Sequence, residues 1–208
     1  MKKIIDPHVL MESIEIYRQG GNVTKYLRSL LNTKSNSTQI IEIAYELQAG
    51  SYIQALRENP SLYMRYINEI SQILTEYITE HDVLLDVGCG ELTTISNVSN
   101  LLKDPPKIIF AFDISWSRIF KGIEYKEKLP LNNPDLIFPF VAEINKIPLP
   151  DKSVSITTSS HALEPNGKNL NKLISELFRV TTNILILFEP YYESNSTQVK
   201  ERMDSLGY

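Results

Sequence analysis

The order of apolar and polar positions divides the chain near residue 80. Beyond that point, short continuous apolar runs alternate with stretches whose apolar residues recur at helical spacing. Short aliphatic runs are typical of strands buried on both faces of a parallel sheet. Their alternation with helices predicts a doubly wound, mostly parallel, Rossmann-like α/β sheet. The runs predict strands at 83–87, 107–112, 136–141, 153–159 and 183–188, and the other stretches predict helices at 92–102, 115–128 and 169–179.

The first 80 residues have helical spacing and no comparable apolar runs. Gly20 and Gly21 end a first helix, and Asn22 is a suitable N-cap for a second one. A third helix is expected over 38–49, and Pro60 suits the first turn of a long fourth helix that ends near residue 78.

This pattern predicts two parts, a helical extension or lid at 1–80 and a Rossmann-like cofactor-binding domain at 81–208. The extension is rich in tyrosine. Most of these rings are expected to pack with their hydroxyls toward water. A few would contribute to a substrate pocket, since lids exclude water and orient reactants.

The first predicted strand ends in a glycine turn, Gly88-Cys89-Gly90, that leads into a helix. A strand, a glycine turn and a helix form the first half of a nucleotide-binding βαβ unit. Because glycine has no Cβ, the turn can be tight and a ligand can lie against bare backbone. Amides at the helix start can donate to a polar or anionic group. Asp86, at the mouth of the strand, is expected to add a fixed negative charge.

The second predicted strand ends in an acidic residue, Asp113. A carboxylate at this place in such a unit accepts from both hydroxyls of a ribose. A dinucleotide-binding turn would read GxGxxG, but the last position here is Thr93. The sequence therefore favours a nucleoside ligand without a diphosphate.

Several ordered segments resemble one family. Leu84-Leu85-Asp86-Val87-Gly88-Cys89-Gly90 resembles the first motif of the class I S-adenosylmethionine-dependent methyltransferases. The segment 142–153 resembles the family's link between its third and fourth strands, 159–164 the end of the fourth strand, and 176–180 the following helix. Two departures stand out. Glu91-Leu92 occupies a place where the family often has another glycine, and Glu143 replaces the usual Asp.

The resemblance covers roughly residues 80–190 and implies S-adenosylmethionine as the cofactor. In the family, the acid after the second strand binds the ribose and an acid in the 142–153 link contacts the adenine amino group. The side chain of the cysteine in the turn is expected to fill space rather than react. The cofactor contacts that the resemblance implies are Asp86, Gly88, Cys89, Gly90, Asp113, Ile114, Glu143, Ile144 and Ser159.

Methyl transfer from a sulfonium is an in-line displacement, so positioning and desolvation supply much of the acceleration. A hydroxyl or protonated amine acceptor must still lose a proton. His161, near the carboxyl end of the fourth strand, is a candidate general base, although it could equally cap or pack against that strand end. Glu164 is the second catalytic candidate. Glu189 and Tyr191, after the fifth strand, are candidate substrate contacts, since a partly buried carboxylate can bind an ammonium or take a proton.

Composition and charge limit the kinds of binding partner that the sequence predicts. The net charge is −4 and the 21 Lys and Arg residues are scattered, so nucleic acid is not an expected partner. No apolar run approaches about 20 residues, so no membrane partner is expected either. A single cysteine fits a reducing cytoplasm. No Cys/His cluster has the spacing of metal ligands, so no metal site is expected.

Together these features predict a methyltransferase that acts on a small molecule through O- or N-methylation. Within enzymes the alternative is an NAD-linked oxidoreductase. Outside enzymes, it is a domain that binds the nucleoside without catalysis.

The end of the chain raises a separate expectation. Members of the resembled family follow the fifth strand with a helix and two more strands, but only the helix, at 194–206, fits into the remaining residues. The strand at 183–188 would then form an apolar sheet edge, and such edges pair with other chains unless they are covered. We expect either a missing C-terminal segment or a cover from the N-terminal helices or a second subunit, as in a homodimer.

Overall fold

Five parallel strands form the centre of the computed structural model, which describes residues 6–207. Their order across the sheet is β3-β2-β1-β4-β5, so the chain moves outward in one direction from β1 and then returns to build the other half. The strands are β1 (Val83–Val87), β2 (Ile108–Asp113), β3 (Ile137–Val141), β4 (Val154–Ser160) and β5 (Thr181–Phe188). This confirms the Rossmann-like α/β fold.

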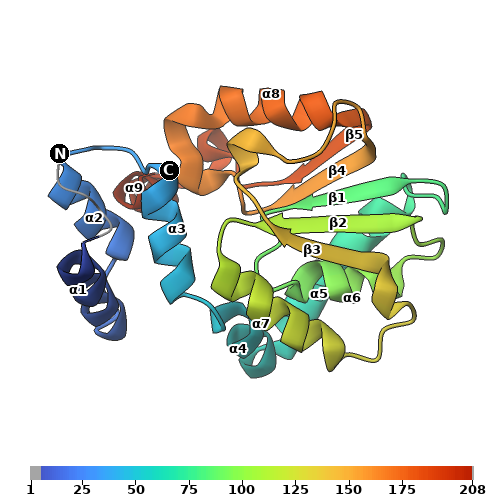
Figure 1. Cartoon of the computed structure of the whole chain (residues 1–208), viewed down its shortest axis with the longest axis horizontal. Helices are drawn as coiled ribbons and strands as arrows, with labels where there is room; N and C mark the ends of the chain where they lie inside the picture. The colour runs from blue at the N-terminus through green and yellow to red at the C-terminus, as the bar shows by residue number, and fades with distance from the viewer. Residues whose placement is uncertain (1–5, 208) are drawn as a thin grey trace.

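Helices cover both faces of the sheet (Figure 1). On one face lie α5 (Pro60–Thr75), α6 (Thr93–Leu101) and α7 (Trp116–Glu127), and on the other lies α8 (Leu170–Val180). Alternate residues of β1 serve the two cores, because successive side chains of a strand point to opposite faces. Leu84 packs with α5 and α6, whereas Leu85 and Val87 pack with α8.

The other N-terminal helices lie at one end of the sheet (Figure 1). They are α1 (Pro7–Arg18), α2 (Val23–Leu31), α3 (Thr38–Leu47) and α4 (Ser51–Glu58). Residues from α2 and α3, including Leu27 and Ile40, form a separate small core. The side chain of Asn22 accepts a hydrogen bond from the amide of Lys25, as the expected N-cap should.

Most predicted elements lie within two residues of the observed ones, but α4 was missed. The helix α4 has only eight residues and none of them is buried, so its short amphipathic pattern was not recognised as a helix. The predicted strand at 183–188 in fact begins at Thr181, because this residue still pairs with Val154 of β4.

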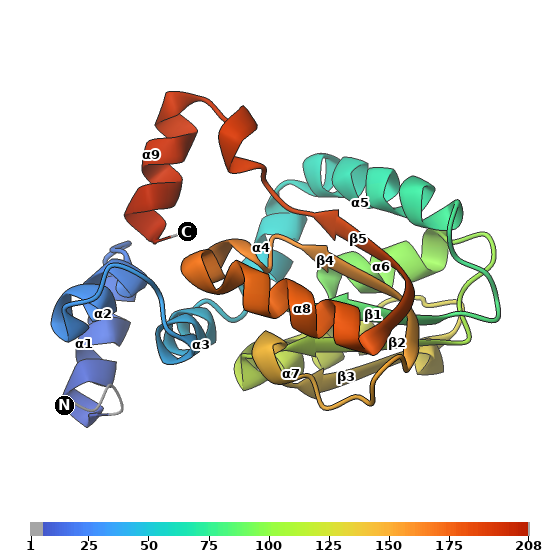
Figure 2. The same cartoon turned by 90° about the horizontal axis from the view of Figure 1, so that it is seen from above.

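The strand β5 lies at one edge of the sheet, as expected, and pairs with β4 alone among residues 6–207. Ile184 and Ile186 face the core under α5, and Leu187 remains 40% exposed. Figure 2 shows that α9 (Thr197–Leu206) leaves the sheet and lies beside the N-terminal helices. There Arg28 of α2 donates to the last carbonyls of α9. A missing segment or a second subunit at the β5 edge stays a prediction.

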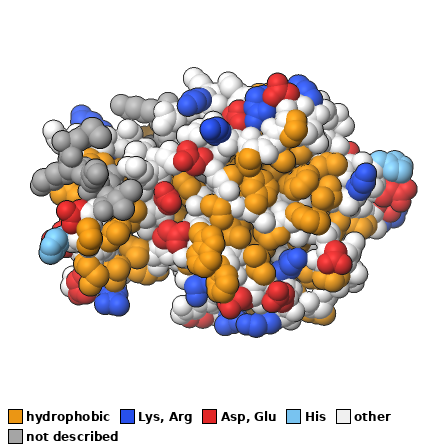
Figure 3. Space-filling model, viewed as in Figure 1, with side chains coloured by type: hydrophobic (Ala, Val, Ile, Leu, Met, Phe, Trp, Pro, Cys, Tyr) orange, Lys and Arg blue, Asp and Glu red, His pale blue; other side chains and the backbone are white. Residues whose placement is uncertain are grey.

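The opposite edge of the sheet, β3, is also apolar. Trp116 and Phe120 of α7 stack on each other and remain largely exposed, as does Phe138 of β3. Figure 3 shows hydrophobic side chains gathered over the part of this face where β3 and α7 lie. Among the residues described, no helix is both long enough and apolar enough to cross a membrane.

Candidate active site

A cavity of about 500 Å³ lies between the carboxyl ends of the strands and the helices α3, α4 and α5. Ligands of open α/β sheets bind at this end, where the strand order reverses. The structure brings most of the sequence-predicted cofactor residues into the wall of this cavity. Those that line it are Asp86, Gly88, Cys89, Gly90, Asp113, Ile114, Glu143 and Ile144, together with the predicted base His161.

Neighbouring side chains of the protein leave no room for a Cβ at either glycine of the turn. Gly88 and Gly90 both have positive φ, at 66° and 56°. An ideal Cβ on Gly88 would lie 2.3 Å from the Cβ of Ala162, and one on Gly90 would lie 2.5 Å from Nη2 of Arg118. Bare backbone is therefore needed here before any ligand is considered.

Leu92 explains how the turn works without another glycine. Its φ is 55°, in the left-handed region, and its side chain is fully buried in the core under α5 and α6. A left-handed conformation costs a non-glycine residue about 1–2 kcal/mol, whereas burial of a leucine side chain contributes about 1.5–3 kcal/mol. The burial offsets the strain, so the turn keeps its shape with leucine in place.

Asp113 links the turn to the start of α7. Its Oδ2 accepts from the amide of Gly90 at 3.0 Å and its Oδ1 from the amide of Ser115 at 2.9 Å. An ionised carboxylate has about four lone-pair sites, so these two bonds leave capacity for the hydroxyls of a ribose.

The side chain of Asp86 is buried and makes no hydrogen bond among the described residues, although it lines the cavity. Burial, and then the charge of Asp113, raise the pKa of Asp86 to about 8. Its carboxyl is thus mostly protonated at neutral pH, and the expectation of a fixed negative charge here was wrong for the empty site. A cation in the cavity would favour the ionised form.

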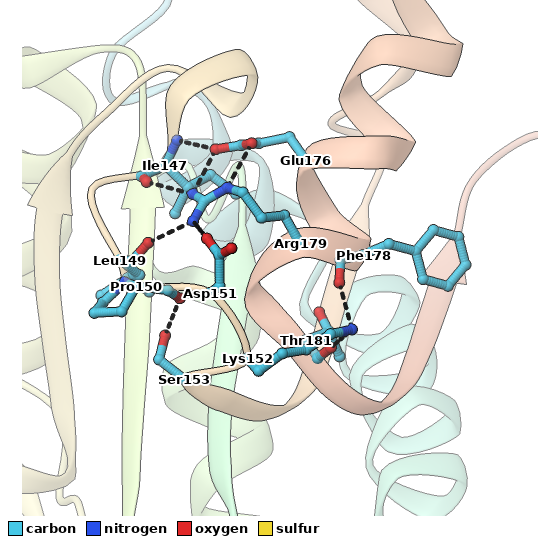
Figure 4. A network of polar contacts seen from close by, with 10 residues as sticks. All are labelled: Ile147, Leu149, Pro150, Asp151, Lys152, Ser153, Glu176, Phe178, Arg179 and Thr181. Atoms are coloured by element: carbon cyan, nitrogen blue, oxygen red, sulfur yellow. Dashed lines mark hydrogen bonds and ion pairs between the residues drawn. The ribbon is translucent and has the colours of Figure 1, made fainter.

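The link between β3 and β4 carries Glu143 and Ile144 into the cavity wall and is fastened to α8 (Figure 4). Arg179 of α8 donates to the carbonyls of Ile147 and Leu149, and it also pairs with Glu176. The carboxylate of Glu176 accepts in turn from the amide of Ile147 at 2.8 Å. This clamp holds the link in position without entering the cavity.

His161 follows β4 directly, with a positive φ of 55°. Its Nδ1 pairs with the carboxylate of Glu164, and its ring lies 6.1 Å from the ring of Tyr66. The hydrogen bond with Glu164 raises the pKa of His161, and burial opposes it only in part. The other ring nitrogen remains available to a group in the cavity.

Four predicted residues, Glu164, Ser159, Glu189 and Tyr191, lie outside the cavity wall. The catalytic role of Glu164, which pairs with His161, stays a prediction. Ser159 is fully buried and donates to Glu189 at 2.7 Å. Glu189 also accepts from the amides of Ala162 and Leu163, so it fixes the turn that carries His161. Tyr191 is 67% exposed. Cofactor contact by Ser159 and substrate contact by Glu189 and Tyr191 stay predictions.

Several residues of the cavity wall were not predicted from the sequence. Tyr45, Tyr52, Tyr63 and Tyr66 reach the cavity from α3, α4 and α5, but nothing local distinguishes them from the packing tyrosines. Arg118 left a clearer signal. It occupies the buried stripe of α7 beside Ile119 and Gly122, and a charged residue on such a stripe requires a partner.

The comparisons with known proteins agree with this geometry. Residues 85–184 match a family model described as a methyltransferase domain. This match covers just under half of the chain and is consistent with the class I S-adenosylmethionine-dependent methyltransferases. The methyl donor is therefore S-adenosylmethionine. A search of the curated proteins found no match.

Solved methyltransferases with TM-scores above 0.5 share the fold. An S-adenosylmethionine-dependent methyltransferase from Aquifex aeolicus is 21% identical with a TM-score of 0.49, over 64% of this chain and 76% of that one. A putative one from Methanococcus maripaludis is 13% identical with a TM-score of 0.57, over 74% and 67%. A putative sarcosine dimethylglycine methyltransferase from Galdieria sulphuraria is 21% identical with a TM-score of 0.51, over 59% and 46%. This methyltransferase chain thus spans less than half the length of the Galdieria protein.

The cavity of the methyltransferase fits its cofactor chemically. S-adenosylmethionine carries a sulfonium and an ammonium, and the buried Asp86 carboxyl has no other partner for its charge among residues 6–207. The unused lone pairs of Asp113 suit the ribose hydroxyls. Removal from water raises the pKa of the Cys89 thiol, so this side chain stays protonated and unreactive beside the cofactor.

Proposed function

We propose that the protein transfers the methyl group of S-adenosylmethionine to an oxygen or nitrogen of a small-molecule acceptor. The observation that carries this proposal is the shared cavity. The glycine turn and Asp113 line one part of its wall, and His161 and the tyrosines of the N-terminal helices line another. Donor and acceptor can therefore lie next to each other in one cavity, as an in-line displacement requires.

The cavity supports a small acceptor. Sites for small ligands commonly measure about 300–1000 Å³, and this one, at about 500 Å³, must hold the cofactor as well. The helices α3, α4 and α5 cover it, which fits the proposed role of residues 1–80 as a lid.

The cofactor supplies an electrophilic methyl group on a positively charged sulfur. In the proposed mechanism Asp86 would balance the positive charge, Asp113 would hold the ribose, and Glu143 and Ile144 would lie against the adenine. His161 accepts the acceptor's proton at the ring nitrogen that is not paired with Glu164. Glu164 orients the ring and stabilises the imidazolium that forms. The tyrosine rings exclude water from the reacting atoms.

The alternative of an NAD-linked oxidoreductase has no support from the family match. A domain that binds the nucleoside without catalysis remains a proposal of a different class. We also place the protein in the cytoplasm, since its single cysteine fits a reducing compartment. A second subunit or a further C-terminal segment is the proposed cover for the β5 edge.

The test is a screen of metabolite pools with S-adenosylmethionine labelled at the methyl group. Hydroxylated and amine metabolites enter separately, and sarcosine and dimethylglycine, which the Galdieria protein's name specifies, are included. The expected result is a labelled small product with the wild type and much less with H161N. Asparagine tolerates the positive φ at this position, so H161N removes the base without straining the turn. Tight cofactor binding with no labelled product in any pool would favour the non-catalytic alternative.

A further inference from the structure

Arg118 is a buried cation next to the cofactor turn, and the proposed chemistry does not use it. It lies in the first turn of α7 with its side chain 7% exposed. Its guanidinium lies over the ring of Tyr45 at 5.1 Å and over the ring of Tyr52 at 4.7 Å. Cation–π contacts of this kind are stronger when they are shielded from water. Since the rings belong to α3 and α4, Arg118 joins two N-terminal helices to the Rossmann-like domain.

Glu91 of the cofactor turn makes the second connection to the same helices. It is 1% exposed, and its Oε2 accepts from the amide of Ile53 in α4 at 2.9 Å. Its Oε1 lies 3.6 Å from Nε of Arg118, and Nη1 of Arg118 lies 3.7 Å from Oδ2 of Asp113. One arginine therefore connects the turn, the predicted ribose acid and the helices above them.

The packing around this pair leaves little room for other side chains. Gly90 must lack a Cβ because Nη2 of Arg118 lies against it. A Cβ on Gly122 of α7 would lie 2.8 Å from the carbonyl carbon of Glu91. The turn and α7 thus approach closely on both sides of the Arg118–Glu91 pair, and neither side chain can leave without moving its neighbours.

The pair is not fully closed in this structure. Among residues 6–207, Nε of Arg118 and Oε1 of Glu91 are buried without a hydrogen-bond partner. Their separation exceeds a normal hydrogen bond by a few tenths of an ångström. A small inward movement of the turn or of α7 would join them. Buried polar groups without partners are costly, so a state that closes this gap is favoured.

We propose that Arg118 and Glu91 form a latch that fastens helices α3 and α4 over the bound cofactor, with Arg118 as a positioning residue. This inference rests on the proposed function insofar as residues 1–80 act as the lid of that cavity. With the cavity filled, a small movement of the turn and Asp113 would close the Arg118–Glu91 pair while the tyrosine rings stay on the guanidinium. Release of the cofactor then requires the pair to open. Glu46 of α3 adds to the same junction, since its Oε1 accepts from the amide of Ser117 at 3.2 Å.

The experiment compares the wild type with R118M, R118K and E91Q. Stopped-flow fluorescence measures the rate at which S-adenosylhomocysteine leaves the protein. Hydrogen exchange measures the protection of residues 38–58, with and without the nucleoside. R118M should release the nucleoside roughly tenfold faster or more, as expected when an interaction with a charged group is lost. It should also raise exchange in 38–58 while α8 keeps its protection.

The other variants separate a latch from a general loss of stability. R118K keeps the charge but has no planar group to lie between two rings, so its release rate should fall between wild type and R118M. E91Q keeps an acceptor for the amide of Ile53 and loses the charge, and its effect should not add to that of R118M. The matched control is R28M, which removes an equally buried arginine that binds α9 instead of the cofactor turn. It should lower Tm without changing release.

Two results would overturn the latch. In one, R118M and R118K release the nucleoside at the wild-type rate with unchanged exchange in residues 38–58. In the other, R28M accelerates release as much as R118M does, which would make the effect one of stability alone. Neither readout needs an acceptor or turnover, so failure of the proposed reaction and failure of the latch remain distinguishable. If the wild type bound no nucleoside, exchange in the ligand-free R118M protein would still decide whether Arg118 fastens α3 and α4.

Discussion

Replacement of Asp86 by asparagine tests the electrostatics of the cofactor site. The Asp86 carboxyl is buried without a hydrogen bond among residues 6–207, and its pKa is raised to about 8. Burial, and then the negative Asp113, favour the protonated form in the empty site. A cationic ligand favours the ionised form instead. Cofactor binding should therefore release a proton from Asp86 at any pH below about 8.

The size of the effect follows from the raised pKa of about 8. For each unit by which the pH falls below this pKa, ionising Asp86 costs about 1.4 kcal/mol more, and the affinity for the cofactor falls tenfold. Between about pH 6 and pH 8 the affinity for S-adenosylmethionine should rise roughly 50-fold and then level off. D86N cannot ionise, so its affinity should be weak and nearly independent of this titration.

Titration calorimetry in two buffers of different ionisation enthalpy measures both the affinity and the protons released. The ligand's own titration appears in wild type and in D86N alike, so the difference between the two profiles isolates Asp86. A second readout is the Tm of the ligand-free protein. Because the pKa of Asp86 is raised in the fold, the unfolded chain ionises this residue at lower pH than the fold does, and the empty fold loses stability as pH rises from the usual aspartate range toward about 8. D86N should therefore have the higher Tm near pH 8 and not near pH 4. Parallel affinity profiles for the two proteins would refute the reasoning.

Three further predictions concern single residues. D113A should weaken S-adenosylmethionine binding by about 1.5–3 kcal/mol in calorimetry, and unchanged affinity would exclude the ribose contact. H161N should lower turnover roughly 10²–10⁴-fold. The hydrogen bond with Glu164 raises the pKa of His161, so the rising limb of the pH–rate profile of E164Q should lie at lower pH than that of the wild type. L92G should lower Tm, since relief of about 1–2 kcal/mol of strain is smaller than the about 2–5 kcal/mol lost with a buried leucine.

The sequence predicted the sheet well because its strands are buried on both faces. A short apolar run such as Val83–Val87, followed directly by glycines, is typical of a central strand, and the structure has β1 there. The element α4 could not be predicted in this way, because its residues remain partly exposed. One of its ties to the domain is the hydrogen bond from the amide of Ile53 to Glu91, 38 positions away. No local pattern reports such a contact.

The candidate site shows the same division. Asp113 and the glycines could be placed at the cavity because acids and bare turns occur at fixed positions along a βαβ unit. Ribose contact by Asp113 stays a prediction. Asp86 was found too, but its protonation was mispredicted, because burial next to Asp113 exists only in the folded chain. The roles of Glu189 and Ser159 also depend on distant contacts, since they hold each other and the His161 turn.

Gly90 shows why a residue can be placed correctly for an incomplete reason. From the sequence, Gly90 was predicted to lack a side chain so that a ligand could approach the backbone. In the structure the guanidinium of Arg118 occupies part of that space. A G90V variant would therefore displace Arg118 and disturb Glu91 whether or not a cofactor touches the turn. Lost binding in G90V alone could not establish ligand contact. G90V combined with R118M separates the two causes, because a smaller, uncharged side chain at 118 makes room for the added methyls. If binding returns in the double variant, the glycine serves the arginine, and if it does not, either the positive φ of 56° or the cofactor itself requires the glycine.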